Sequence, residues 1–236
     1  MQEPAAPHPN SEFVASAREW LPTATFKESV AFYEEFCADG ADDWTVAEIG
    51  KADRFFLLTH LLRRPDAAHP WLYERCREVE RDPDGRLDLW AREHFKSTLI
   101  TYAGAVQEIL RDPEITIGIF SHTRPIAKGF LRQIKTEFEG NEALKQLYPG
   151  ILWQSPRKEA GKWSEDDGIV VRRKSNPKES TVEAWGLVDG QPTGKHFKLL
   201  IYDDVVTLES VSSPEMIAKV TNAWALSLNL GAASNE

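Results

Sequence analysis

Cysteines and long apolar runs are scarce in this sequence. Its 236 residues include only two cysteines, Cys37 and Cys76. Two isolated cysteines provide no disulfide framework and indicate a reducing compartment. No apolar stretch approaches the length of a membrane span, and the N-terminal residues lack the basic start and apolar run of a secretory signal. We therefore predict a protein without a membrane partner.

An excess of positive charge is also missing. The formal net charge is −9, from 28 Lys and Arg against 37 Asp and Glu. Because nucleic-acid-binding domains are usually basic, charge alone argues against a nucleic-acid binder. Hydrophobic residues make up 42% and aromatic residues 10% of the chain. This content can form the core of one good-sized domain, or of one and a half.

The pattern of apolar residues divides the chain near residue 85. Residues 11–80 follow helical spacing, and Thr25 with Glu28 fits a capping box at a helix start. A turn at residues 82–85 ends this region. We predict an N-terminal extension and helical region over residues 1–84 and a second domain over residues 85–236.

The second domain alternates predicted strands and helices. We expect strands at 87–91 and 115–120, each followed by a helix, at 96–110 and 125–138. Residues 141–167 are predicted to be irregular, and 168–174 with 180–185 to form an antiparallel pair. A strand at 198–202 and a helix beginning at Ser213 and Pro214 complete the pattern. This alternation predicts an α/β fold with a parallel sheet flanked by helices.

A candidate phosphate-binding loop lies between the first predicted strand and its helix. Lys96 would reach the β- and γ-phosphates of a nucleotide, the hydroxyl of Ser97 would coordinate Mg²⁺, and the first helix amides would face phosphate oxygens. Trp90 and Phe95 stand where the usual motif has glycines. An ordinary helix start with a Lys-Ser pair is the alternative.

A pair of acids follows the strand at 198–202. Asp203 would hold Mg²⁺ through its water shell, and Asp204 would orient the attacking water. Two acids after a strand also occur in plain turns. Because ligands bind at the carboxyl ends of the strands in open α/β sheets, this pair and the loop support each other. Arg92, four residues before Lys96, could stabilise charge on the γ-phosphate.

The run from Asp88 to Thr98 resembles the variant Walker A motif of bacteriophage-type large terminase subunits. In that family an arginine commonly precedes the lysine by four residues, and the glycines are often replaced. The stretch 181–186, with Gly190 and the residues from Gly194 to Asp204, is similar to the family's path into Walker B. The resemblance covers about residues 85 to 210.

This resemblance implies a RecA-like P-loop ATPase core, preceded by an N-terminal helical region, that uses ATP and Mg²⁺. It implies a DNA-packaging motor that hydrolyses Mg-ATP to move double-stranded DNA into a procapsid. The partners would be double-stranded DNA, the portal protein and a small terminase subunit. The chain would form a homo-oligomeric ring on the capsid, or a monomer in isolation, in the host cell cytoplasm at the procapsid portal.

The resemblance also assigns residues to the site. The catalytic residues would be Asp204 and Arg92, and Ser97 and Asp203 would hold the metal. Asp204 stands where the family usually has glutamate. The chain ends before the family's coupling-motif strand and nuclease domain, so weak turnover and no DNA cleavage are expected. The implied ATP-binding residues are Arg92, Glu93, His94, Phe95, Lys96, Ser97 and Thr98.

Other functions remain open at this point. The chain could be another P-loop enzyme, a helicase-like translocase or a nucleotide kinase, or a nucleotide-binding fragment without hydrolysis. Arg124 and Arg132 fit either a trans arginine finger or a solvated helix face. Trp71 and Tyr73 fit either core packing or stacking on adenine.

Overall fold

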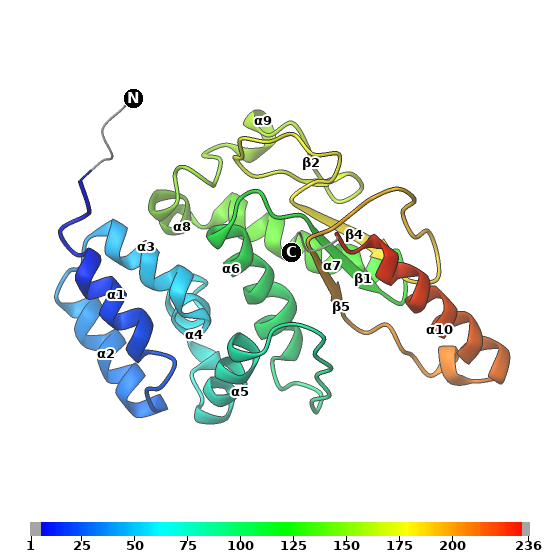
Figure 1. The fold of residues 1–236 in the computed structure, drawn as a ribbon, viewed down its shortest axis with the longest axis horizontal. Coiled ribbons are helices and arrows are strands. Elements are labelled where there is room, and N and C mark those ends of the chain that lie inside the picture. Colours follow the sequence, from blue (N-terminus) through cyan, green and yellow to red (C-terminus); the bar gives the residue numbers. More distant parts are fainter. Residues whose placement is uncertain (1–5, 233–236) are drawn as a thin grey trace. The chain divides into compact units, whose positions relative to one another are not determined.

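The computed structural model describes residues 6–232 in two compact units, Met1–Lys96 and Ser97–Glu236 (Figure 1). The first five residues of the predicted N-terminal extension lie outside the described residues. The division between the compact units falls after Lys96. The predicted domain boundary between residues 84 and 85 is based on the change of sequence pattern and stays a prediction. Among residues 6–232, every helix is too short or too polar to cross a membrane.

The first unit is helical, as the sequence predicts. The predicted capping box is confirmed, because the Thr25 side chain accepts a hydrogen bond from the backbone N–H of Glu28 and the Glu28 side chain accepts one from Thr25. Its elements are α1 (Ser11–Trp20), α2 (Phe26–Ala38), α3 (Asp43–Ala52), α4 (Arg54–Phe56), the π-helical turn η1 (Leu57–Leu61), the 3₁₀ turn η2 (Pro65–Ala67) and α5 (Pro70–Arg81).

A buried ion pair lies in the core of this unit. The carboxylate of Asp53 accepts hydrogen bonds from Arg77, at 2.6 Å, and from the Tyr33 hydroxyl, at 2.5 Å. It also accepts the backbone N–H groups of Phe55 and Phe56 at the start of α4. Burial raises the pKa of Tyr33, which keeps the hydroxyl protonated as a donor. A buried charge with this many partners is satisfied and holds α2, α4 and α5 together.

The strand predicted at 87–91 does not form. The segment has no regular structure, and the side chains of Leu87 and Leu89 are 81% and 84% exposed. Asp88 instead accepts local hydrogen bonds from the side chains of Arg86 and Trp90. An alternating pattern forms a strand only where a neighbouring strand can pair with its backbone groups. Within the described first unit there is no strand for this segment to pair with.

The second unit contains a five-stranded mixed sheet in the order β2-β3-β4-β1-β5. Its central strands β4 (Val182–Gly186), β1 (Ile117–Ser121) and β5 (Leu199–Tyr202) are parallel. The edge strands β2 (Trp163–Ser164) and β3 (Gly168–Ile169) are antiparallel. The α/β class is confirmed, and the sheet is mixed because the antiparallel pairing predicted between 168–174 and 180–185 forms between β3 and β4. The register places Phe120 beside Trp185 and Tyr202, so the three parallel strands end together.

Helices cover this sheet, and most lie where the sequence predicts them. The predicted irregular segment 141–167 is the exception, because it contains α8, α9 and β2; the side chain of Asn141 caps α8 by accepting from Leu144 N. The predicted strand 168–174 is also shorter, with only β3 formed. The elements are the π-helical run η3 (Thr98–Ala103), α6 (Gly104–Arg111), α7 (Arg124–Gly140), α8 (Glu142–Leu147), α9 (Pro156–Glu159), η4 (Glu209–Val211), α10 (Pro214–Ser227) and η5 (Leu228–Leu230).

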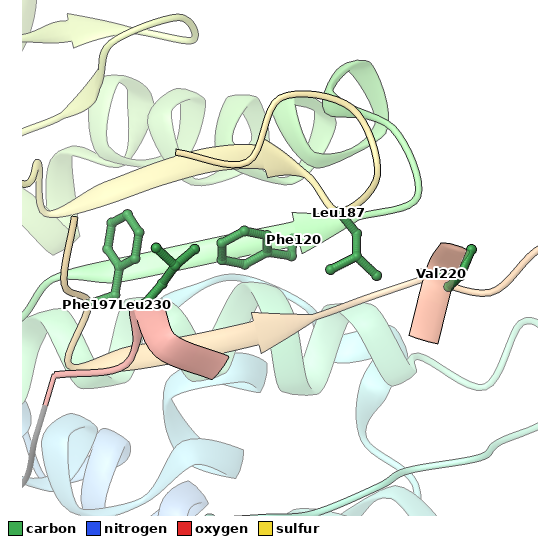
Figure 2. Close-up of a cluster of buried hydrophobic side chains, with 5 residues drawn as sticks. All are labelled: Phe120, Leu187, Phe197, Val220 and Leu230. Atoms are coloured by element: carbon green, nitrogen blue, oxygen red, sulfur yellow. The ribbon is translucent and has the colours of Figure 1, made fainter. Parts of the chain in front are cut away.

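An apolar cluster packs on one face of the parallel strands. Figure 2 shows its five buried side chains, contributed by β1, α10, η5 and the segments next to β4 and β5: Phe120, Leu187, Phe197, Val220 and Leu230. Gly118 on β1 leaves the space that the Phe197 ring fills, since a Cβ there would lie 2.8 Å from that ring. The cluster fixes β1 and β5, and with them the residues at their carboxyl ends.

Candidate functional site

The predicted acid pair directly follows β5, at the carboxyl edge of the sheet. The backbone N–H of Asp203 donates to the carbonyl of Phe120 at 2.9 Å, so pairing with β1 continues to this residue. The Asp203 side chain is buried, whereas Asp204 is exposed. Asp204 has a φ of 51°, and its carbonyl accepts the backbone N–H of His122 at 3.2 Å. The two carboxylates therefore have different environments, one enclosed and one open to solvent.

A hydrogen bond joins the buried acid to the helix that follows the candidate phosphate loop. The hydroxyl of Thr101, on η3, donates to Oδ2 of Asp203 at 2.6 Å, and both residues are buried. Lys96 and Ser97 are already helical, so helical backbone runs without a break from residue 96 to residue 111. The predicted helix is thus confirmed, and its first turns lie next to the carboxyl end of β5.

Thr101 is the site residue that the sequence interpretation misses. The available signal is a hydroxyl side chain four residues after Ser97, on the same side of a helix. That spacing becomes informative only once the helix is known to approach Asp203. Because a buried carboxylate needs hydrogen-bond partners, the hydroxyl of Thr101 helps to hold the carboxylate of Asp203 in one orientation.

The predicted loop has left-handed backbone at two positions of the first unit. Glu93 has a φ of 64° and Phe95 a φ of 60°. Residues with a side chain rarely adopt this conformation, and strained positions of this kind cluster at functional sites. Phe95 occupies the position of the second glycine in the usual phosphate-loop motif. The loop therefore has a glycine-like backbone at this point without a glycine.

Aromatic side chains surround this loop within the first unit. The indole of Trp71 meets Trp90 and His94 edge to face, with ring centroids 5.2 and 5.4 Å apart. The guanidinium of Arg64 lies 5.5 Å from the centre of the Phe95 ring. Trp71 therefore packs against the loop. Tyr73 is a core residue, as the core-packing alternative predicts: it is buried, and its hydroxyl donates to the carbonyl of Ala24.

The structure groups the predicted site residues by unit. Ser97, Thr98, Asp203 and Asp204 belong to the second unit. The predicted loop residues Arg92, Glu93, His94, Phe95 and Lys96 belong to the first unit and are described only within it. Arg92, Glu93 and His94 are exposed, and the Arg92 carbonyl lies 2.7 Å from Nδ1 of His94. The exposed loop side chains are open to solvent and to a ligand.

The predicted metal ligands are one hydroxyl, Ser97, and one carboxylate, Asp203. Residues 6–232 contain no group of three or more His, Cys, Asp or Glu that could hold a metal. Mg²⁺ in nucleotide sites keeps several waters and is held by one or two protein oxygens together with phosphate. The buried carboxylate of Asp203, oriented by Thr101, fits this sparse type of site.

The two arginines after β1 have partners within the second unit. The guanidinium of Arg124 lies 4.7 Å from the centre of the Trp185 ring, and Arg132 forms a salt bridge of 2.6 Å with Glu165. The side chain of Arg132 is mostly solvent-exposed, with a side-chain exposure of 61%. These contacts do not decide between the two alternatives for Arg124 and Arg132, a trans arginine finger and a solvated helix face.

The sequence was compared with protein-family models and with curated proteins. No family model matches, and no curated protein matches.

Proposed function

We propose that this chain is the ATPase part of a DNA-packaging motor of the bacteriophage large-terminase type. The observation that carries the proposal is the buried hydrogen bond between Thr101 and Asp203. This bond joins a strand-end carboxylate to the helical run that follows Ser97 within the second unit. A lysine and a hydroxyl at a helix start, with an acid at the end of a neighbouring strand, form the arrangement that binds Mg-nucleotide in P-loop proteins.

Each residue has a distinct proposed role. Lys96 and the first helical amides bind the phosphates, and Arg92 stabilises the charge that develops on the γ-phosphate. Ser97 and Asp203 would hold Mg²⁺, which when bound neutralises phosphate charge. Asp204 orients the attacking water, since its carboxylate is exposed whereas that of Asp203 is enclosed. The left-handed backbone at Phe95 supports a phosphate loop at this position.

The motor assignment has a separate basis. It depends on the resemblance of residues 85 to 210 to large terminases, which supplies the partners as well as the reaction. Double-stranded DNA, the portal protein and a small terminase subunit are accordingly proposed partners. The helical first unit and the α/β second unit agree with a helical region preceding an ATPase core.

Binding of Mg-ATP by the Lys96→Ala variant tests the phosphate site. The variant should lose measurable affinity in calorimetry, because a hydrogen bond to a charged group contributes about 1.5–3 kcal/mol. Lys219→Ala, which removes an exposed lysine from α10, is the matched control and should bind as the parent does. Equal affinities of all three proteins would show that the loop does not bind phosphate.

Nucleotide binding without hydrolysis is a second candidate function. It is favoured by Trp90 and Phe95, which replace both loop glycines and limit how closely the backbone approaches a phosphate. A steady-state ATPase assay with and without double-stranded DNA separates the two. Turnover that rises with DNA supports the motor, and tight Mg-ATP binding with no turnover in either condition supports the binding module.

A further inference from the structure

A line of basic residues runs along α7. Arg124, Lys128, Arg132 and Lys135 follow one another at intervals of four, four and three residues, so they share one side of the helix. This line lies beside the buried stripe of the same helix, formed by Ala127, Leu131, Ile134 and Phe138. Of the net charge of −9, residues 1–96 carry −7 and residues 97–236 carry −2. The acidic balance of the chain thus belongs mainly to the first unit.

An acidic turn between β2 and β3 covers this line. Glu165 accepts from Arg132 at 2.6 Å, and the carboxylate of Asp166 pairs with Lys128. The guanidinium of Arg124 donates to the backbone carbonyl of Asp166 at 2.7 Å. The hydrogen bonds from Arg132 and Lys128 hold the pKa values of Glu165 and Asp166 below their usual ranges. Arg124, Lys128 and Arg132 are therefore each bonded to one oxygen of this turn.

Glu165 and Asp166 lie outside the backbone pairing of the sheet. β2 and β3 have two residues each, and β3 joins the sheet through the single pair Ile169 and Val182. The Asp166 side chain is 72% exposed, so solvent already competes for its ion pair with Lys128. Ion pairs this exposed contribute little net free energy. The base of the turn keeps its own anchor, because the Ser180 hydroxyl donates to the carbonyl of Asp167 at 2.7 Å.

We propose that Arg124, Lys128 and Arg132 form a contact surface for the phosphate backbone of double-stranded DNA, which the acidic turn occupies when no DNA is bound. Cations four residues apart lie about 6 Å from one another along a helix. A regular line of positive charge with this spacing complements a chain of regularly spaced phosphates. The turn presents its oxygens to the same cations, so phosphates must displace it. This DNA-contact proposal rests on the proposed function only for its partner, double-stranded DNA.

Fluorescence anisotropy with a labelled duplex, in the absence of nucleotide, tests this surface. The double variant Glu165→Gln/Asp166→Asn removes the competing carboxylates and should bind the duplex severalfold more tightly than the parent. The double variant Lys128→Gln/Arg132→Gln should bind more weakly at every salt concentration. Its plot of log affinity against log salt should lose about two units of slope, one for each phosphate contact.

Control variants distinguish an effect of this surface on DNA affinity from an effect of net charge. Glu108→Gln and Arg111→Gln each remove one charge, negative or positive, from a half-exposed ion pair of α6. Both should bind as the parent does, and Arg132→Lys should nearly restore the affinity lost in Arg132→Gln. Equal shifts per removed charge from the α6 variants and the double variants, or unchanged affinity of both double variants, would overturn the proposal. Because nucleotide is absent, these results are independent of whether Lys96→Ala affects ATP binding.

Discussion

Asp203 and Asp204 are adjacent in sequence, but the backbone gives them different tasks. Asp203 continues the pairing of β5 and is enclosed, whereas Asp204 has a left-handed φ and is exposed. Asp203→Asn should weaken Mg-ATP binding, because it removes a negative charge beside the cation. Asp204→Asn should keep the affinity and lower single-turnover hydrolysis about 100-fold or more, because only the transition state needs that carboxylate.

A nearby exposed acid provides the control for these variants. Glu209→Gln should match the parent in both affinity and hydrolysis. If Asp204→Asn keeps its rate and Glu209→Gln loses it, Glu209 is the water-orienting acid. Asp204→Glu adds the methylene that the terminase family usually has at this position. Faster hydrolysis in this variant would show that the shorter side chain limits the parent.

Thr101 is expected to act on the metal through Asp203. Thr101→Val keeps the shape of the side chain and removes the donor, which leaves a buried carboxylate with one partner fewer. The Mg²⁺ concentration needed for half-maximal ATP binding should therefore rise, while Thr101→Ser should behave as the parent. A Thr101→Val protein with lower thermal stability but an unchanged Mg²⁺ requirement would limit Thr101 to a packing role.

At the scale of the elements, the packing of β1 against the apolar cluster requires a glycine at position 118. A Cβ at Gly118 would lie 2.8 Å from Phe197 and 3.0 Å from Phe120. Gly118→Ala should therefore lower the free energy of unfolding by about 1–3 kcal/mol, as overpacked cores do. Gly129→Ala on α7 is the matched control, because its Cβ would meet no atom within 4 Å. That variant should be more stable than the parent by about 0.4–1 kcal/mol. Urea denaturation measures both.

Local sequence patterns predict an element when its partners are also local. The helix start at Ser213 and Pro214 is found where predicted, because its cap and first turn lie within a few residues. The apolar runs of β1 and β5 are also found, since buried parallel strands are apolar throughout. The pattern at 87–91 fails because a strand requires a distant pairing partner. The acid pair could be located from its strand, but the contact between Thr101 and Asp203 spans 102 residues and follows only from the fold.

At the scale of the whole molecule, the segment between α5 and η3 is an accessible connection. Residues 82–94 are exposed or half-buried and carry no regular structure beyond turns. Proteases cut such segments first, so brief trypsin treatment should cleave after the exposed Arg92. If the loop binds phosphate, Mg-ATP should slow this cut. Lys96→Ala should be cleaved as fast as the parent without nucleotide and should gain no protection. Protection that persists in Lys96→Ala would place the nucleotide elsewhere.

The π-helical run Thr98–Ala103 has a consequence for how this helix tolerates insertions and deletions. In this run the backbone N–H of Gly104 bonds to the carbonyl of Leu99, five residues earlier, so the helix contains one residue more than regular α-helical turns would use. Deleting one residue of the run other than Thr101 would remove this extra residue, so the helix would become regular while α6 and the start of the helix keep their faces. A deletion within α6 has no extra residue to remove and would turn the two parts of the helix by about 100° relative to one another. A single-codon deletion in the run should thus yield a folded protein that still binds Mg-ATP, whereas a single-codon deletion within α6 should abolish that binding.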